Sequence, residues 1–437
     1  MSVIMRENKE PVILTLKNLK WMYRGEGNAN LVISLPEKKV IIRMQKCVYD
    51  VSINKDLLEA KLVKDVQFHK NIMAPLLGRT FVHAPVLARI SENEIAEINN
   101  CLYVIRPKFR LNKGVRCSLV TCHPDYTRLS PNLSYDFGLS LPFLNENSTY
   151  CFEIKPKQGW THPADRQQTK CAFCGHQYLK FMKKRILKLS KYCPLDLFSG
   201  DVNRMKKALK NLLATPQNNL KIFKNGDVIY SEDCTNDFVD TLREFLRSTE
   251  LNPEAILETW SSIMQEALTK PLTEDSPLPT IVDDAVGSDT SSSYTGCDWN
   301  YVALPKNCVL HRILTVQKLQ KTNFNSVYKA YREKCEFEGD YDYVNRLLTS
   351  FNDLDPIQRY LLSVTAKDCS IFLSFQLCQD KIDNSYHYVT FDRVHYRLNI
   401  GISDIDPKPL SCLEKHYRRD KDVLSAIRFL ENSKIIV

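Results

Sequence analysis

The sequence predicts a mixed α+β chain, and three observations lead to this expectation. Short runs in which apolar and polar residues alternate recur in both halves of the chain, as in half-buried strands. Longer stretches with helical periodicity lie between them. The 437 residues accommodate two to three domains, or one two-lobed unit. His123, Pro124 and Asp125 break a strand-like run and suit a hinge, which separates a smaller first lobe, residues 1–123, from a larger second lobe, residues 124–437.

Composition narrows the classes of protein to consider. The hydrophobic share of 43% is ordinary for a globular chain. The sequence contains no run of about 18 apolar residues, the length that a membrane span needs. The start of the chain lacks the pattern of a secretory signal. Lysine and arginine number 60 against 51 acidic residues, and the resulting net charge of +9 favours an anionic partner. The 15 cysteines, an odd number, predict reduced thiols and a location in the cytoplasm and nucleus.

The first lobe is expected to begin with a glycine-containing hairpin over residues 21–33, followed by a strand over residues 39–43. Gly25 and Gly27 would let backbone N–H groups approach phosphate oxygens closely. Arg43 stands on a strand where nucleotide kinases often place a cation that holds phosphates. An ordinary hairpin turn and an exposed arginine remain the alternative.

Periodicity and turn signals locate the other elements. In the first lobe we expect a helix over residues 54–75, ended by Pro75 to Gly78, and strands over residues 81–90, 101–105 and 117–122. In the second lobe we expect helices over residues 177–191, up to Leu213, over 235–270, over 307–364 and at the C-terminus, and strands before Gly226, within 365–378 and over 396–402. Residues 271–300 are rich in Ser, Thr and Asp and are expected to be a disordered insertion.

Residues 149–157 predict a strand that ends on charged side chains. Apolar residues alternate along it, and Pro156 cannot continue the hydrogen-bond ladder of a strand. Glu153, Lys155 and Lys157 would therefore form a charged rim on a rigid element. A solvated strand end is the alternative.

The most basic stretch covers residues 177–191, which contain six cations and no acidic residue. A helix here would present a wide positive face, and nucleic acid is the default partner for such a face. The stacking aromatics of RNA-binding patterns are not interleaved with these cations, which weakens that interpretation. A solvated face is the alternative.

Asp368 and Asp404 are expected at the ends of two buried strands, where their carboxylates can converge. One carboxylate could then orient or deprotonate a hydroxyl group, and the other could hold Mg²⁺. Structural aspartates in turns are the alternative.

A zinc site is predicted around Cys171 and Cys174, which form a Cys-x-x-Cys pair. With His162 and His176 they would supply the four ligands of a closed tetrahedral site. A different fourth ligand, such as His123, and two small buried thiols at a helix start are the alternatives.

A set of motifs in chain order resembles the inositol-pentakisphosphate 2-kinase family. The matching segments are Arg24-Gly-Glu-Gly-Asn-Ala-Asn-Leu-Val, Val40-Ile-Ile-Arg-Met-Gln-Lys, Arg106-Pro-x-x-Arg110, Glu153-Ile-Lys-Pro-Lys, His176-Gln-x-Leu-Lys180, Pro194-Leu-Asp-Leu-Phe-Ser-Gly, Gln217-Asn-Asn-Leu-Lys-Ile-Phe-Lys-Asn-Gly, Thr365-Ala-Lys-Asp-Cys-Ser-Ile and Asp404-x-x-x-Lys408-Pro. The resemblance implies a two-lobed, kinase-like α+β fold, with an antiparallel sheet in the smaller lobe and a sheet with helices in the larger one.

The resemblance also implies an activity and a set of site residues. The enzyme would use ATP and Mg²⁺ to phosphorylate the 2-hydroxyl of inositol 1,3,4,5,6-pentakisphosphate, which gives inositol hexakisphosphate (phytate). Asp368 would be the catalytic base, and Asp404 would bind Mg²⁺. The implied nucleotide-binding residues are Gly25, Glu26, Gly27, Asn28, Ala29, Asn30, Arg43 and Asp125. The implied inositide-binding residues are Arg110, Lys155, Lys157, Lys180, Asn218, Asn219 and Lys408.

One departure from the family pattern lies beyond Lys408. Some members carry an Arg and a Tyr that also touch the inositide, and here these positions align with Cys412 and His416, with Arg418 or Arg419 as candidate substitutes. Two other functions stay open: a non-catalytic protein that binds RNA or phosphoinositide, and a kinase for a different inositol phosphate. We expect a monomer that needs neither nucleic acid nor a membrane span.

Overall fold

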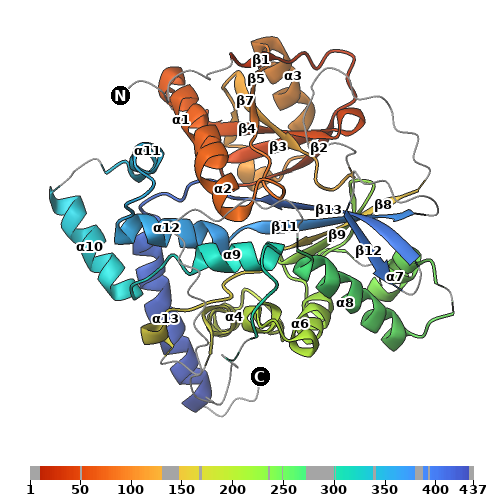
Figure 1. The fold of residues 1–437 in the computed structure, drawn as a ribbon. Coiled ribbons are helices and arrows are strands. Elements are labelled where there is room, and N and C mark those ends of the chain that lie inside the picture. The colour runs from red at the N-terminus through yellow and green to blue at the C-terminus, as the bar shows by residue number, and fades with distance from the viewer. Residues whose placement is uncertain are drawn as a thin grey trace. The chain divides into compact units, whose positions relative to one another are not determined.

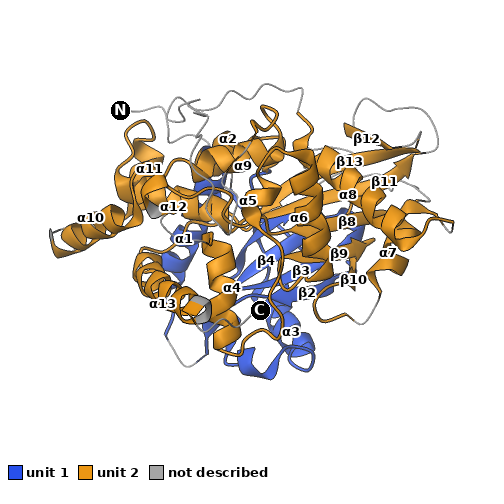
Figure 2. Ribbon diagram, turned by 90° about the horizontal axis from the view of Figure 1, so that it is seen from below, with its two compact units in different colours: residues 1–71, 83–125, 132–145 blue, residues 72–82, 126–131, 146–437 orange. Residues whose placement is uncertain are grey.

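The computed structural model of the chain describes residues 10–49, 52–129, 147–166, 170–234, 237–248, 250–271, 300, 302–337, 341–378, 387–391 and 394–432. It has two sheets with flanking helices and divides into two compact units (Figure 1, Figure 2). Unit 1 comprises residues 1–71, 83–125 and 132–145, and unit 2 comprises residues 72–82, 126–131 and 146–437. The α+β class is therefore confirmed. Apart from residues 271 and 300, the expected insertion over residues 271–300 lies outside the described residues.

Unit 1 is built on a seven-stranded sheet with the strand order β1-β5-β7-β4-β3-β2, in which β6 also pairs with β4. Its strands are β1 (Val12–Ile13), β2 (Met22–Glu26), β3 (Asn30–Leu35), β4 (Val40–Val48), β5 (Val86–Arg89), β6 (Lys113–Val115) and β7 (Leu119–Pro124). All pairings are antiparallel except that between β1 and β5. The expected hairpin is present as β2 and β3.

Two helices pack on the sheet of unit 1. The helix expected near residues 54–75 is α1 (Lys55–Phe68). A π-helical turn at His69–Met73 leads from it into the short α2 (Ala74–Leu77), which belongs to unit 2, and Gly78 caps that end. The strand expected over residues 101–105 is wrong, because α3 (Glu92–Leu102) ends in that segment and a turn follows it at residues 103–105. A reciprocal capping box between Ser91 and Glu94 starts this helix, and we overlooked that signal.

Unit 2 contains a fully antiparallel six-stranded sheet with the order β10-β9-β8-β11-β13-β12. Its strands are β8 (Thr149–Ile154), β9 (Leu220–Lys224), β10 (Asp227–Tyr230), β11 (Ser370–Cys378), β12 (His387–Phe391) and β13 (Val394–Ser403). The strands expected at residues 149–154, before Gly226, within 365–378 and over 396–402 are confirmed.

The register of this sheet gathers four strand ends at one edge. Ile154, the last residue of β8, pairs with Leu220, the first of β9, and with Ile371 near the start of β11. Ser370, the first residue of β11, pairs with Ser403, the last of β13. Because neighbouring strands run in opposite directions, the residues that follow β8 and β13 meet those that precede β9 and β11.

The helices of unit 2 are α4 (Ala172–Met182), α5 (Pro194–Leu197), α6 (Val202–Ala214), α7 (Phe238–Leu246), α8 (Pro253–Thr269), α9 (Val309–Gln317), α10 (Phe324–Phe337), α11 (Tyr343–Thr349), α12 (Pro356–Lys367) and α13 (Cys412–Asn432). An aromatic cluster joins α7 and α8 to the sheet, since Phe245 and Trp260 pack against Phe152 of β8. Among the described helices, none has the length and apolar character needed to cross a membrane.

The helix expected over residues 177–191 is wrong in its second half. α4 ends at Met182, and Lys184 adopts a left-handed φ of 52° that closes the helix. Arg185 and Lys188 therefore lie in the segment after the helix, and the predicted continuous positive helix face does not form.

Candidate active site

Asp404, Lys155, Glu153 and Ser370 form one group at the edge where the strands of unit 2 end. Lys155 Nζ donates to Asp404 Oδ2 at 3.1 Å and lies 3.9 Å from Glu153 Oε1. The Ser370 hydroxyl lies 3.0 Å from Glu153 Oε1 and 3.2 Å from Asp404 Oδ2, between the two carboxylates. Burial lowers the pKa of Lys155, but the charges of Asp404 and Glu153 outweigh burial and raise it.

Asp368 lies beside this group and is held by two lysines. It is the C-terminal cap of α12, and its Oδ1 accepts from Lys157 Nζ at 3.3 Å while its Oδ2 accepts from Lys408 Nζ at 3.0 Å. Desolvation raises the pKa of Asp368, but the positive charges of Lys157 and Lys408 outweigh it and hold this pKa below its ordinary value. The carboxylate is therefore charged at neutral pH, and 56% of its side-chain surface stays exposed.

Two of these residues have strained backbones. Lys157 has a φ of 62° and Asp404 a φ of 60°, in the left-handed region that residues with a Cβ seldom occupy. Such a conformation costs about 1–3 kcal/mol and persists only where the surroundings impose it. Both residues follow strand ends at the same edge, and their side chains pair with Asp368 and Lys155, respectively.

Two further residues of unit 2, Asn219 and Lys180, were predicted to bind the inositide. The Asn219 carbonyl accepts from Lys155 N–H at 2.9 Å, and its buried side-chain Oδ1 has no partner among the described residues. A buried amide oxygen without a partner suits a ligand that offers a hydrogen-bond donor, such as a hydroxyl group. Burial and then the charge of Lys157 lower the pKa of Lys180, which places these two lysines in one electrostatic environment. Asn218 is exposed.

Further cations surround His176 on α4. Burial and the charges of Lys180, Arg419 and Arg185 lower the pKa of His176 to about 4, so its imidazole is neutral. α4 and α13 pack through a small apolar cluster, and this packing brings Arg419 of α13 into the region. Of the two residues that depart from the family pattern, Cys412 is buried, and His416 Nδ1 lies 2.8 Å from the Tyr360 hydroxyl.

In unit 1, the predicted phosphate loop is a tight connection between β2 and β3. Gly25 has a φ of 141° beside a bulge in the pairing, a conformation that favours glycine. The Gly27 N–H donates to the Asn30 carbonyl, and Ala29 accepts from the backbone N–H of Lys46. Asn28 accepts from Lys113 Nζ at 3.3 Å.

The Glu26 side chain is turned into unit 1. Its carboxylate pairs with Lys46 and accepts from Arg106 Nε at 2.8 Å, and all three side chains are at most 2% exposed. Burial raises the pKa of Glu26, but the two cations outweigh it and keep the pKa low. Arg106 also donates to the carbonyls of Arg110 and Lys113. Glu26 thus braces the loop and the Arg110 segment, and only the backbone of residue 26 remains for a phosphate.

The other predicted residues of unit 1 occupy three different elements. Arg110 ends a 3-10 turn at Lys108–Arg110, and its Nη1 is buried without a partner among the described residues, which suits an anionic ligand. Arg43 lies on β4. Asp125 is buried, its carboxylate accepts from the Ser34 hydroxyl at 3.0 Å, and its N–H donates to the Lys39 carbonyl.

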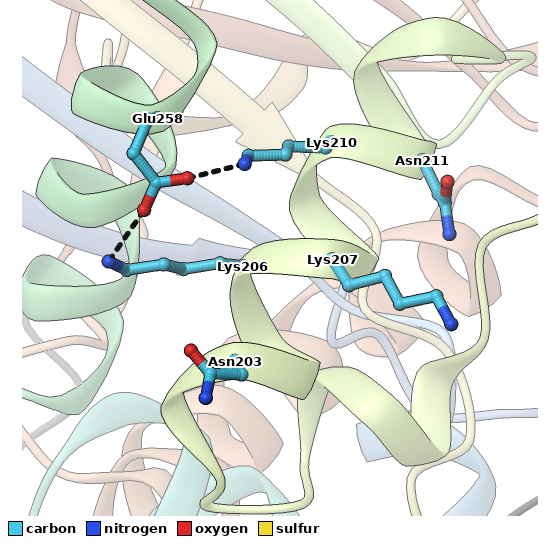
Figure 3. Close-up of a pocket in the computed structure, with 6 residues that line it drawn as sticks. All are labelled: Asn203, Lys206, Lys207, Lys210, Asn211 and Glu258. Atoms are coloured by element: carbon cyan, nitrogen blue, oxygen red, sulfur yellow. Dashed lines mark hydrogen bonds and ion pairs between the residues drawn. The ribbon is translucent and has the colours of Figure 1, made fainter. Parts of the chain in front are cut away.

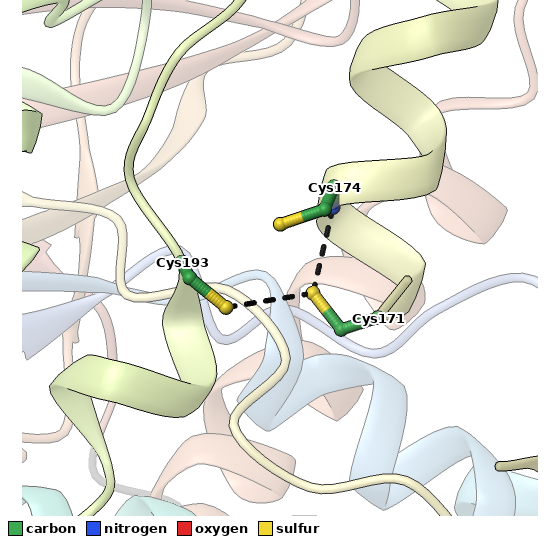
Figure 4. A group of neighbouring side chains, drawn as sticks. All are labelled: Cys171, Cys174 and Cys193. Atoms are coloured by element: carbon green, nitrogen blue, oxygen red, sulfur yellow. Dashed lines mark hydrogen bonds between the residues drawn. The ribbon is translucent and has the colours of Figure 1, made fainter. Parts of the chain in front are cut away.

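A group of three thiols brings Cys171 and Cys174 together with Cys193 (Figure 4). The three sulfur atoms lie within 4.8 Å of one another, and Cys171 Sγ is 3.8 Å from Cys193 Sγ. Neither His162 nor His176 belongs to this group. His162 Nδ1 accepts from the Ala164 N–H, and its Nε2 lies 3.2 Å from the Lys321 carbonyl.

A separate lysine-lined pocket lies between α6 and α8, with a volume of about 290 Å³ (Figure 3). Lys206 and Lys210 both pair with Glu258, so one carboxylate offsets two of its cations. None of the residues predicted for catalysis or inositide binding lines this pocket, and we do not assign the reaction to it.

Sequence reasoning placed Glu153 in a charged rim but gave it no role in the reaction, and it did not single out Ser370 or Gln317. All three contact site segments. Glu153 and Ser370 lie inside matching motifs, and that position was a usable signal. Gln317 is fully buried and hydrogen-bonded to the backbone of Lys157 and of Ala366. Its only signal was a polar residue on the buried face of a helix.

Comparison with known proteins gives a consistent result along the chain. A sequence model described as inositol-pentakisphosphate 2-kinase matches residues 23–422. Curated proteins with that name include one from Danio rerio, which is 27% identical in an alignment that covers 93% of this chain and 92% of the relative. One from Arabidopsis thaliana is 28% identical with the same coverages. One from Drosophila melanogaster is 28% identical over 53% of this chain and 52% of the relative.

Proposed function

The chain belongs to the inositol-pentakisphosphate 2-kinase family, as its motifs predicted, and from this premise we propose that it transfers the γ-phosphoryl group of ATP to the 2-hydroxyl of inositol 1,3,4,5,6-pentakisphosphate. The product is inositol hexakisphosphate. The observation that best supports this reaction is the strand edge of unit 2, where carboxylates and lysines alternate in contact. A protein that only binds polyanions gains nothing from acidic groups among its cations.

Each residue of the edge has a role in the proposed reaction. Asp368 accepts the proton of the 2-hydroxyl as that oxygen attacks the γ-phosphorus, and ADP leaves. Lys155, Lys157 and Lys408 are proposed to hold inositide phosphates through charge-assisted hydrogen bonds. Their present carboxylate partners keep them extended toward the edge.

Asp404 is proposed to hold Mg²⁺, which offsets the charge of the transferred phosphoryl group when bound. The residues present fit this ion by their chemistry, because Mg²⁺ prefers hard oxygen ligands such as carboxylates. The carboxylates of Asp404 and Glu153 lie close together here, since both are within hydrogen-bond distance of the Ser370 hydroxyl. In unit 1, the backbone of residues 25–30 and Arg43 are proposed to bind ATP phosphates, Asp125 the adenine, and Arg110 an inositide phosphate.

The test is to incubate the purified protein with Mg-ATP and a panel of inositol phosphates and to separate the products by chromatography. We expect inositol hexakisphosphate from the pentakisphosphate and little turnover of other isomers. Faster turnover of another isomer would assign the enzyme to a different inositol phosphate. ADP release that does not depend on any inositide would contradict the proposal.

We also propose a structural zinc ion on Cys171, Cys174 and Cys193. A tetrahedral site with Zn–S bonds of about 2.3 Å places its sulfurs about 3.8 Å apart, which is the separation of Cys171 and Cys193. We expect one equivalent of zinc by elemental analysis of protein purified without a metal-affinity tag. A Cys171→Ser/Cys174→Ser variant should lose it, with a lower Tm and a nearly normal KM. Zinc below a tenth of an equivalent in both proteins would remove the site.

A reducing location in the cytoplasm and nucleus and a monomeric state are proposed as well. No described cysteine forms a disulfide, and this supports the location. Imaging of a fluorescent fusion tests the location, and light scattering tests the oligomeric state.

A further inference from the structure

Gln317 links two segments of the strand edge through its side-chain amide. It is the last residue of α9 and is fully buried. Its Oε1 accepts from the Gly159 N–H at 2.8 Å, while its Nε2 donates to the carbonyls of Lys157 at 3.0 Å and Ala366 at 3.3 Å. A carboxamide has two N–H donors, and here each has its own acceptor. The partners fix the orientation of the amide, because a flipped amide would face donor with donor and acceptor with acceptor.

The two bridged segments carry the residues of the proposed chemistry. One contains Lys157, whose backbone adopts the strained φ of 62°. The other is the end of α12, where Ala366 lies two residues before Asp368. Their side chains meet in the half-exposed pair of Lys157 Nζ and Asp368 Oδ1 at 3.3 Å. Such a pair contributes little to stability and is screened by salt. The buried amide, by contrast, joins the two backbones and is shielded from water.

The surroundings hold the amide and the Lys157 segment firmly. The Ser363 hydroxyl donates to the Gln317 carbonyl at 2.7 Å, and this bond fixes the end of α9 against α12. The Tyr192 hydroxyl donates to the Pro156 carbonyl at 2.7 Å. Gly159 packs so closely on the Phe198 ring that an added Cβ would lie 2.1 Å from it.

We propose that Gln317 is a positioning residue for phosphoryl transfer, which fixes the separation between the phosphate-binding lysine at 157 and the base at 368. This inference rests on the proposed function. Gln317 does not touch a substrate. It acts through the strained backbone of Lys157 and through the end of the helix that presents Asp368, and a misplacement of about 1 Å at such a pair lowers turnover strongly.

The experiment compares Gln317→Met, which keeps the volume but removes every side-chain hydrogen bond, with the control Gln376→Met. Gln376 is a buried glutamine in the same unit that also donates to a backbone carbonyl, that of Asn147, far along β11 from the site. Both variants are expected to lower Tm by a similar amount. At a temperature well below both Tm values, Gln317→Met should lower kcat about 10–100-fold and raise the KM for the inositide, with the KM for ATP within about twofold. Gln376→Met should keep all three constants within about twofold of wild type.

A double-mutant cycle with Lys157→Ala separates positioning from general stability. If Gln317 acts through Lys157, the loss of kcat caused by Gln317→Met should shrink to about threefold or less in the Lys157→Ala background. Equal losses in both backgrounds would overturn the proposal, as would a Gln317→Met enzyme with wild-type constants. If Gln317→Met does not fold, Ser363→Ala supplies the milder variant, and wild-type kcat and inositide KM in that variant would overturn the proposal. A wild-type protein that does not phosphorylate inositol pentakisphosphate would instead refute the proposed function.

Discussion

The charged residues at the strand edge of unit 2 pair with neighbours of opposite charge. Asp368 contacts Lys157 and Lys408, and Asp404 contacts Lys155. Without ligand, each of these lysines therefore has a carboxylate partner. When a polyphosphate binds, these lysines can turn to phosphate oxygens, which leaves Asp368 free to accept a proton.

Replacement of Asp368 tests its role as the base. Asp368→Asn keeps the shape of the side chain but removes the charge and the basic oxygen, and we expect kcat to fall about 10²–10⁴-fold. Nucleotide binding, measured by calorimetry, should change by less than about threefold. Retention of more than half the wild-type kcat would contradict the assignment.

The lysines around Asp368 predict a pH dependence. Lys157 and Lys408 hold the pKa of Asp368 below its ordinary value, so the base stays deprotonated as the pH falls. Removing one cation in Lys408→Met raises this pKa in the free enzyme, and the acid limb of kcat/KM for the inositide should move to higher pH. Lys183→Met, which removes an exposed lysine paired with Asp422, is the control and should leave the limb in place. An acid limb that stays put or moves to lower pH in Lys408→Met would contradict the electrostatic account.

At the scale of elements, unit 1 depends on a buried ionic group between its strands and its loop. Glu26 ends β2 and pairs with Lys46 of β4 and with Arg106, which in turn binds the carbonyl groups around the Arg110 turn. The phosphate loop and the Arg110 turn therefore share one anchor, and a change at Glu26 should disturb both.

Glu26→Gln should destabilise unit 1 strongly. The substitution leaves two buried cations without their anion, and we expect a loss of about 3–5 kcal/mol in the free energy of unfolding, measured by urea denaturation. Glu59→Gln is the matched control, because Glu59 pairs with Arg89 in the same unit at a half-exposed site. Its loss should stay below about 1 kcal/mol. Equal losses in the two variants would show that burial of the Glu26 group carries no special energy.

The strands that carry the site could be predicted from local sequence patterns, whereas the tertiary contacts between them could not. Alternation and Pro156 predicted β8 and its end, and β11 and β13 were predicted in the same way. The contact of Lys157 with Asp368 spans 211 positions of the chain, and no local pattern carries such a pairing. The early end of α4 was missed as well, because Lys184 adopts a left-handed conformation without the glycine that normally signals it.

At the scale of the whole molecule, the net charge of +9 favours encounter with a highly anionic substrate. Several cations act together on the inositide, and salt screens exposed charges beyond about 10 Å at 0.1 M. We therefore expect the KM for the inositide to rise several-fold between about 0.05 M and 0.5 M potassium chloride, and to rise more than the KM for ATP. Sucrose of equal osmolality is the control and should leave both constants unchanged. A flat response to salt would argue against a polyphosphate substrate.

The strand order of unit 2 has a consequence for biosynthesis. β8 pairs on one side with β9, which follows after a modest interval, but on the other side with β11, whose Ile371 pairs with Ile154. Roughly 200 residues separate these partners. At translation rates of about 5–20 residues per second, β8 waits on the order of 10–40 s for its second neighbour. During that interval one side of β8 has no partner strand and can pair with another chain, so the strand that places Lys155 is also a site where the nascent chain is prone to aggregate.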